Sequence, residues 1–272
     1  MTAVSDQSRT VSTISHAAQA TAARRTLPEE TPVALVYNGT THAVMMATPA
    51  DLLDFATGFA LSEGVIDRAA DLGEVEILHH AAGIEARAWL PEERAAALTA
   101  RRRMMTGPVG CGLCGIDSLA QALRPLAPLA QGGARLTPAE VTLALDELRD
   151  WQPLHDETRA THAAGFYRPG QGIVMAREDV GRHNALDKLT GALARAGIDP
   201  GEGAIVLTSR ISVDMVQKCV TARCPVLLAV SSPTAHAVRL AEAAGLTLAS
   251  TARGETHVFS HPDRIAEAPH VS

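Results

Sequence analysis

The second half of the chain alternates short apolar runs with longer segments whose apolar residues recur at helical spacing. The apolar runs cover 172–176, 204–209, 225–231, 246–250 and 256–260, and the helical patterns cover 183–195, 212–222 and 234–245. Continuously apolar strands alternate with helices in this way when both faces of a sheet are covered. The pattern therefore predicts an α/β fold class with a layered sheet in this half.

The first half predicts a smaller α+β unit. Two apolar runs, Val33–Tyr37 and Thr41–Met46, flank the dipeptide at 38–39. That dipeptide is Asn-Gly, which favours a tight hairpin because both residues accept positive φ. Two further short strands are expected at 74–80 and 83–90, and a helix starts near Pro91.

Two helices carry start signals in the sequence. Thr48 is expected to cap a helix that stops at Gly64, and Thr137 with Glu140 three residues later forms a capping box. The second signal predicts a helix over 137–151. The division of the chain then reads as a disordered leader over 1–30, a small N-terminal α+β domain over 31–103, a cysteine loop and connector over 104–136, and an α/β domain over 137–272.

Charge and composition narrow the function. The net charge is −6 with a pI near 6.0, which argues against nucleic acid or an anionic membrane as partner. The leader lacks the apolar core of a secretory signal, and no apolar run reaches the roughly 18 residues that span a bilayer. Four cysteines are too few for a disulfide scaffold. We therefore expect a cytoplasmic protein that meets any anionic ligand with local arginines and lysines.

The stretch "TGPVGCGLCGID" at 106–117 places Cys111 and Cys114 among glycines, directly before an expected helix start. A helix N-terminus lowers the pKa of a nearby cysteine and raises its thiolate fraction. This suits a nucleophilic or persulfide-carrying cysteine. A zinc site stays open as an alternative, since His155 and Glu157 form an H-x-E, although zinc deaminases place that motif before their cysteines.

Basic residues gather where strands of the α/β half end. The segment "AREDVGRHNALDKLTG" at 176–191 brings Arg177, Arg182, His183, Asn184 and Lys188 to a helix entrance, which is typical of an anion site. Arg210 follows the next strand, and Arg253 with Gly254 follows a later one. His162, in the segment at 157–166, is read equally as structural or functional. Three such loops at one sheet edge indicate a site for a large phosphorylated ligand.

Taken together, these segments resemble the formate dehydrogenase accessory sulfurtransferase (FdhD) family. The resemblance is carried by "PVALVYNG", "MATPADLLDFATGFALSEGVI", "GCGLCG", "THAA", "REDVGRHNALDKL", "SRISVDMVQK" and "LTLAS…THVFSHP". It implies a homodimeric sulfur carrier whose C-terminal part is similar to cytidine deaminase. The implied partners are a cysteine desulfurase, which donates persulfide sulfur, and formate dehydrogenase. The implied substrate is the bis-molybdopterin guanine dinucleotide cofactor of molybdenum, with guanine nucleotide as a partial mimic.

The resemblance also assigns residues. Cys111 would carry the persulfide and Cys114 would assist the relay. The nucleotide-cofactor segment falls on Thr251, Ala252, Arg253, Gly254 and Glu255, with Arg182, His183, Lys188 and Arg210 as further contacts. The loop "SRI" places Arg210 one position earlier than the Ser-Gly-Arg of many relatives.

Two other hypotheses stay beside this one. The first is a zinc-dependent nucleotide deaminase that uses Cys111, Cys114, His155 and Glu157. The second is a cofactor-binding chaperone without catalysis, in which the two cysteines are structural. The remaining cysteines, Cys219 and Cys224, are expected to be small buried apolar side chains.

Overall fold

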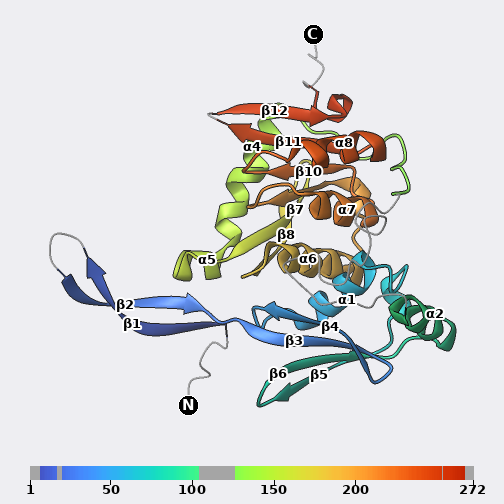
Figure 1. Ribbon diagram of the computed structural model, residues 1–272. Helices are drawn as coiled ribbons and strands as arrows, with labels where there is room; N and C mark the ends of the chain where they lie inside the picture. The colour runs from blue at the N-terminus through green and yellow to red at the C-terminus, as the bar shows by residue number, and fades with distance from the viewer. Residues whose placement is uncertain (1–6, 17–19, 104–125, 253, 267–272) are drawn as a thin grey trace, which may run out of the picture.

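The computed structural model describes residues 7–16, 20–103, 126–252 and 254–266. Its largest layer is a six-stranded sheet in the order β12-β11-β10-β9-β7-β8 (Figure 1). The strands are β7 (His162–Arg168), β8 (Gly172–Asp179), β9 (Ala204–Leu207), β10 (Val226–Ala229), β11 (Thr247–Ala252) and β12 (Glu255–Ser260). The expected α/β fold class with a covered sheet is confirmed.

The strand directions bring several chain segments to one edge of this sheet. Strands β9, β10 and β11 are parallel, and β7 is antiparallel to both β8 and β9. The carboxyl ends of β8, β9, β10 and β11 therefore point the same way, and β7 begins at the same edge. Strand β12 also begins there, because it is antiparallel to β11. We call this the carboxyl edge of the sheet.

Helices cover both faces of the sheet. One face packs against α6 (Arg182–Ala196), α7 (Val213–Thr221) and α8 (Ala235–Ala244), and the other against α4 (Pro138–Glu147) with the 3₁₀ turn η2 (Leu148–Trp151). Both hydrogen bonds of the predicted capping box between Thr137 and Glu140 are present. Cys219 and Cys224 are fully buried on the first face, as predicted, and burial raises the pKa of the Cys219 thiol.

Strand β7 was not among the predicted strands, although it lies inside the sheet. Its sequence, "HAAGFYR", is short of the β-branched residues that mark a strand. The close approach of its neighbours explains the small residues, because a Cβ on Gly165 would lie 2.6 Å from Leu148 Cδ1. The likeness of this half to cytidine deaminase, implied by the resemblance, stays a prediction.

The smaller N-terminal unit holds a four-stranded sheet in the order β4-β3-β6-β5. Its elements are β3 (Thr31–Tyr37), β4 (Thr40–Ala47), β5 (Val75–His80), β6 (Gly83–Ala88), α1 (Leu52–Ser62) and α2 (Glu92–Arg103), with a 3₁₀ turn η1 (Ala69–Asp71). The predicted hairpin at Asn38 and Gly39 is confirmed, with φ of 48° and 74°. The observed order of strands and helices matches the α+β character that the sequence predicts for this unit.

Two predictions in this region are wrong. Thr48 does not cap α1, which begins after Asp51; its N–H donates to Asp179 Oδ2 (3.0 Å) and its Oγ1 accepts from the Val180 N–H (3.1 Å). The leader expected to be disordered over 1–30 contains the antiparallel hairpin of β1 (Ser8–His16) and β2 (Ala20–Pro28). The Thr, Val and Ile residues of β1 favour a strand, whereas the polar composition of the leader as a whole favoured disorder.

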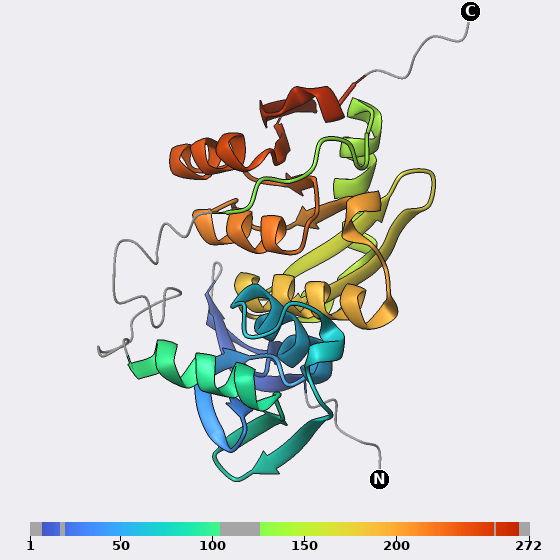
Figure 2. The same cartoon turned by 90° about the vertical axis from the view of Figure 1, so that its right-hand side faces the viewer.

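The two units meet where α1 packs on α6 (Figure 2). A Cβ added to Gly58 would lie 1.7 Å from the Asp187 carbonyl oxygen, and one added to Gly191 would lie 1.9 Å from that of Asp54. The helices therefore approach through their backbones, and only glycine fits at the crossing. The remaining elements are α5 (Pro153–Thr158) and the 3₁₀ turns η3 (Pro200–Glu202) and η4 (Pro262–Arg264). Within the described residues, no helix combines the length and apolarity needed to cross a bilayer.

Candidate functional site

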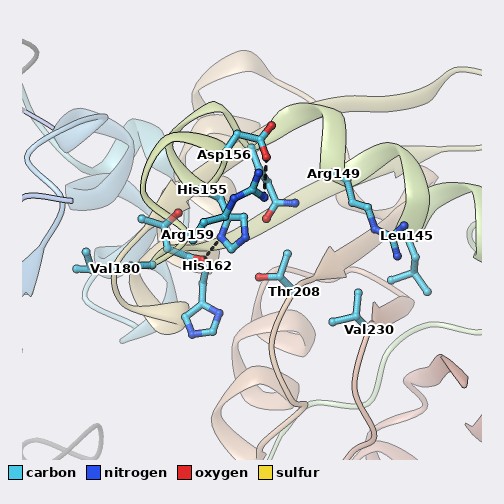
Figure 3. Close-up of a pocket in the computed structure, with 12 residues that line it drawn as sticks. Leu145, Arg149, His155, Asp156, Arg159, His162, Val180, Thr208 and Val230 are labelled. Atoms are coloured by element: carbon cyan, nitrogen blue, oxygen red, sulfur yellow. Dashed lines mark hydrogen bonds and ion pairs between the residues drawn. The ribbon is translucent and has the colours of Figure 1, made fainter. Parts of the chain in front are cut away.

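A pocket of about 770 Å³ opens at the carboxyl edge of the sheet. It lies between the ends of β8, β9 and β10, the start of β7, and the segment of η2 and α5 that folds over them (Figure 3). Its polar lining includes Arg149, Gln152, His155, Arg159, His162 and Thr208. Pockets at this edge are the usual ligand sites of α/β sheets.

The wall made by α5 is held in place by one carboxylate from β8. Glu178 accepts the N–H of Leu154 (2.8 Å) and of His155 (2.7 Å), and also the hydroxyl of Thr161 (3.0 Å). The first two bonds satisfy backbone donors at the start of α5 that have no partner inside the helix. Glu178 is therefore a positioning residue, and the adjacent Asp179 serves a different part of the molecule.

The two arginines of the pocket are only loosely paired. Arg159 is 3.1 Å from Asp156, with both side chains about 62% exposed, and Arg149 is 3.3 Å from Asp146. Exposed pairs of this kind contribute little to stability, so both guanidinium groups are available to an anionic ligand. Arg159 also ends α5 in the left-handed conformation, with φ of 57°.

The two histidines of the pocket differ in their partners. His155 Nδ1 lies 3.0 Å from the Thr161 carbonyl oxygen, so Nδ1 carries the proton and Nε2 is the free ring nitrogen. His162 is half-buried at the first position of β7. Burial lowers the pKa of His162, and the nearby charges of Arg182, His155 and His183 lower it further, while Asp179 acts against them. At neutral pH His162 is therefore mostly uncharged.

Several predicted site residues lie at or near the carboxyl edge. Arg182 and His183 begin α6 and act on the charge of His162, and His183 Nε2 is 3.6 Å from Asp214 Oδ2. Arg210 is exposed in the loop after β9. Thr251, Ala252, Gly254 and Glu255 belong to the β11–β12 hairpin, whose tip is at this edge (Figure 1), and Arg253 is outside the described residues. The prediction that three loops meet at one edge is thus matched by the strand directions.

Lys188 is placed elsewhere. Its ammonium is fully buried and lies 2.7 Å from Asp179 Oδ2, 2.9 Å from the Thr48 carbonyl oxygen and 3.4 Å from that of Glu178. Asn184 beside it donates to the Met46 carbonyl (2.8 Å) and to Asp179 Oδ1 (2.9 Å). In this arrangement Lys188 joins the two units and does not face the pocket.

Further charged residues, from the segment 176–191 and from elsewhere in the chain, also hold the junction between the two units. Arg177 donates to Asp54 Oδ2 at 2.9 and 2.7 Å, and Arg195 donates to the other oxygen of that carboxylate. The buried Asp187 accepts from Ser62 (2.7 Å) and from Lys218 (2.7 and 2.8 Å). Burial raises the pKa of Asp187, and the Lys218 ammonium acts against this. We call these contacts, with those of Lys188 and Asn184, the junction network.

The cysteines Cys111 and Cys114 lie outside the described residues, so the structure does not place them relative to the pocket. The deaminase hypothesis needs Glu157 as an acid–base group in the pocket. Glu157 is not in the lining, and its Oε1 accepts from Ser8 Oγ at 3.0 Å. Among the described residues, no three His, Cys, Asp or Glu side chains are grouped as metal ligands.

Arg149, Gln152 and Arg159 are among the lining residues that the sequence did not indicate. They come from the end of the helix predicted over 137–151 and from the segment after it, "QPLHDETRA" at 152–160. That segment is dense in charged and polar residues, and this density was the available sequence signal for a binding site. What the sequence did not show is that α5 folds back over the carboxyl edge, because this placement depends on contacts with Glu178, distant in the chain.

Comparisons with known proteins agree on one family. The FdhD/NarQ family model matches residues 28–266. The sulfur carrier protein FdhD of Agrobacterium fabrum is 50% identical over 242 residues, covering 89% of each chain. That of Bordetella bronchiseptica is 49% identical over 239 residues, covering 88% of this chain and 86% of the relative.

A solved structure shows the same fold over nearly the whole chain. It is a crystal structure of a candidate formate dehydrogenase accessory protein from Desulfotalea psychrophila. The two align with a TM-score of 0.75 at 26% identity, covering 96% of this chain and 100% of the other. The sequence resemblance, the fold and these matches lead to one conclusion: the chain belongs to the FdhD/NarQ family.

Proposed function

We propose that this protein is a sulfur carrier that supports formate dehydrogenase, acting as a sulfurtransferase. The observation that carries the proposal is the match to relatives named sulfur carrier protein FdhD at about half identity over nearly nine-tenths of the chain. The accessory-protein description of the aligned crystal structure supports the link to formate dehydrogenase. The sequence supplies the two cysteines that such a carrier needs.

The proposed first step is thiol exchange with a cysteine desulfurase. The Cys111 thiolate attacks the outer sulfur of the desulfurase persulfide, the S–S bond of the donor breaks, and the donor cysteine leaves as a thiolate. Cys111 then carries the new S–S bond as a persulfide, without net oxidation. Release of that sulfur as sulfide needs two electrons, which Cys114 supplies by forming a disulfide with Cys111 that a thiol reductant later reopens.

The proposed substrate of the second step is the bis-molybdopterin guanine dinucleotide cofactor before it enters formate dehydrogenase. Its phosphates call for cationic groups on a protein of net charge −6, and the pocket offers Arg149, Arg159 and nearby Arg182. The loop over 251–255 stands at the same edge, as a cofactor-binding segment would. We further propose that the protein works in the cytoplasm as a homodimer.

Mass spectrometry tests the sulfur-carrying step. After incubation with a cysteine desulfurase and cysteine, the intact protein should gain about 32 Da, the mass of one sulfur atom, and the gain should be reversed by a thiol reductant. Cys111→Ala should abolish the gain, whereas Cys219→Ala, in a buried cysteine, is the control that should keep it. No gain in the wild-type chain, or a gain that survives Cys111→Ala, would contradict the proposal.

Formate dehydrogenase activity in cells tests the biological role. A strain that lacks its own accessory protein should recover activity with the wild-type chain and lose it with Cys111→Ala. Separate Cys111→Ala and Cys114→Ala variants, checked for equal protein levels, would show whether both cysteines are needed for activity. Full activity in the double variant would favour a chaperone without sulfur transfer.

A further inference from the structure

The charge of His162, which lines the pocket, is influenced by neighbours on several elements. Arg182 and His183 act from α6, His155 from α5 and Asp179 from the end of β8, while Arg159 and Asp156 line the same pocket from the end of α5. Figure 3 shows the His162 ring in the lower part of the view, between Val180 at the left and Thr208 at the right. Its position at the start of β7 fixes its backbone in the sheet.

Among the described residues, Asp179 is the carboxylate that favours a charged His162, and both of its oxygens already have other partners. Asp179 Oδ2 binds the Lys188 ammonium (2.7 Å) and accepts from the Thr48 N–H (3.0 Å). Oδ1 accepts from the Gly181 N–H (2.8 Å) and from Asn184 (2.9 Å). A carboxylate with this many partners has little capacity left to stabilise an imidazolium.

The His162 ring is thus left among positive groups without a committed anion. Among the described residues, no hydrogen bond or ion pair holds either of its nitrogens. An anion that entered the pocket would reverse this balance, because it would screen Arg182 and His183 and give the ring a partner. A nearby opposite charge favours the protonated form of a histidine.

On the basis of the nucleotide-bearing cofactor proposed above, we propose that His162 takes up a proton when a diphosphate group enters the pocket and then binds it as an imidazolium. His162 is in this respect a proton-linked specificity residue for anionic ligands. The proton comes from solvent and forms an N–H bond on the ring, no other covalent bond changes, and release of the ligand returns the proton. The empty pocket keeps the ring uncharged, which limits repulsion between it and the arginines.

The linkage has a defined sign. Because ligand binding adds a proton, affinity rises as pH falls through the ordinary histidine range near 6.5, by at most about tenfold per pH unit for one proton. Terminal phosphates titrate near pH 6 and would blur the result. The suitable probe is therefore diguanosine diphosphate, whose two phosphates are both diesters and keep constant charge in this range.

Calorimetric titration of the full chain with diguanosine diphosphate tests the proposal. Measurements at about pH 6, 7 and 8, each in two buffers of different ionisation enthalpy, give both the affinity and the protons taken up. The wild-type chain should take up a fraction of a proton near neutral pH and bind more tightly on acidification. His162→Gln should remove most of the uptake and flatten the pH dependence, whereas His155→Gln and His183→Gln should retain the uptake.

The outcomes separate this inference from the proposed function. Binding without proton uptake, or uptake that persists in His162→Gln and disappears in His155→Gln or His183→Gln, overturns the role of His162 but leaves the pocket as a ligand site. If the probe does not bind at any pH, both the role of His162 and the assignment of the pocket as a ligand site are overturned. Circular dichroism checks that each variant is folded. If His162→Gln does not fold, His162→Asn provides a second neutral variant.

Discussion

The junction network and the carboxyl-edge pocket use similar residues in opposite ways. In the junction network, the carboxylates are buried and paired, as in Asp179 with Lys188, where both side chains have no exposed surface. In the pocket, Arg149 and Arg159 are more than half exposed and held only by weak surface pairs. Buried ion pairs stabilise one arrangement of two elements, whereas exposed arginines keep their binding capacity for a ligand.

The residues of a single sequence motif are divided between the junction network and the pocket. In "REDVGRHNALDK", Glu178 positions the pocket wall, Arg182 and His183 lie near the pocket, and Asp179 and Lys188 join the two units. A dense run of polar residues therefore indicates importance without separating ligand binding from domain assembly. The position along α6 decides, since residues 184–193 are all buried, whereas Arg182 and His183 at its start are only partly buried.

The largest expected effect is at the junction. Lys188→Met leaves the Asp179 carboxylate buried without its cation, so the free energy of unfolding should fall by about 3–5 kcal/mol. Urea denaturation measures the loss. Arg239→Met, at an exposed position of α8, is the matched control and should change stability by less than about 0.5 kcal/mol.

A double variant keeps this prediction testable if Lys188→Met does not fold. Asp179→Asn with Lys188→Met removes both charges and should be less destabilised than the sum of the single variants, since no buried charge is left alone. Equal effects of Lys188→Met and Arg239→Met would contradict the division between junction and pocket.

The helix crossing should respond next most strongly. Gly58→Ala places a Cβ 1.7 Å from a backbone oxygen of α6, so the helices must separate, and we expect a loss of about 1–3 kcal/mol or more. Thermal denaturation followed by circular dichroism measures it. Gly201→Ala meets only the flexible Asp199 carboxylate, at 3.1 Å, and should be nearly neutral. A neutral Gly58→Ala would show that the crossing is looser than described.

In the pocket the expected effect is on binding instead of stability. Arg149→Ala and Arg159→Ala should each weaken binding of guanosine diphosphate about tenfold, because each removes a charge-assisted contact worth about 1.5 kcal/mol or more. Calorimetry measures the affinity and urea denaturation the stability. Arg239→Ala controls for the loss of one positive charge. If it weakens binding as much, general attraction and not the pocket explains the affinity.

The smallest effect concerns His162 in the ligand-free protein. Its pKa is lower in the folded than in the unfolded chain, so the folded state resists the proton that the unfolded state accepts. Stability should therefore decline as pH falls below the ordinary value near 6.5, and His162→Gln should show a shallower decline. Urea denaturation at several pH values compares the two slopes. If the stability of the two proteins falls equally steeply with falling pH, the predicted contribution of His162 is contradicted.

The sequence predicted much of the fold because its signals are local. The turn at Asn38–Gly39 and the capping box at Thr137 each act within a few residues, and both are present. The hairpin of β1 and β2 was missed because the polar composition of the leader favoured disorder. The central strand β7 was missed because partners later in the chain decide its pairing. The same holds for Thr48, whose bonds go to Asp179 and Val180.

The candidate site was predicted in outline only. The carboxyl edge, Arg182, His183 and the 251–255 hairpin follow from strand order. The roles of Arg149, Arg159 and Glu178 depend on α5 packing over that edge, and the burial of Lys188 depends on α1. Neither packing leaves a local sequence signal. The roles that the family resemblance assigns to Cys111 and Cys114 stay predictions, since both cysteines lie outside the described residues.

Hydrogen–deuterium exchange with and without guanosine diphosphate tests the division between pocket and junction most directly. Ligand in the pocket should slow amide exchange in the segment that forms its wall, residues 149–162, and in the loop after β9. It should leave α1 and the second half of α6 unchanged. Protection confined to α1 and α6, with none over 149–162, would contradict the account.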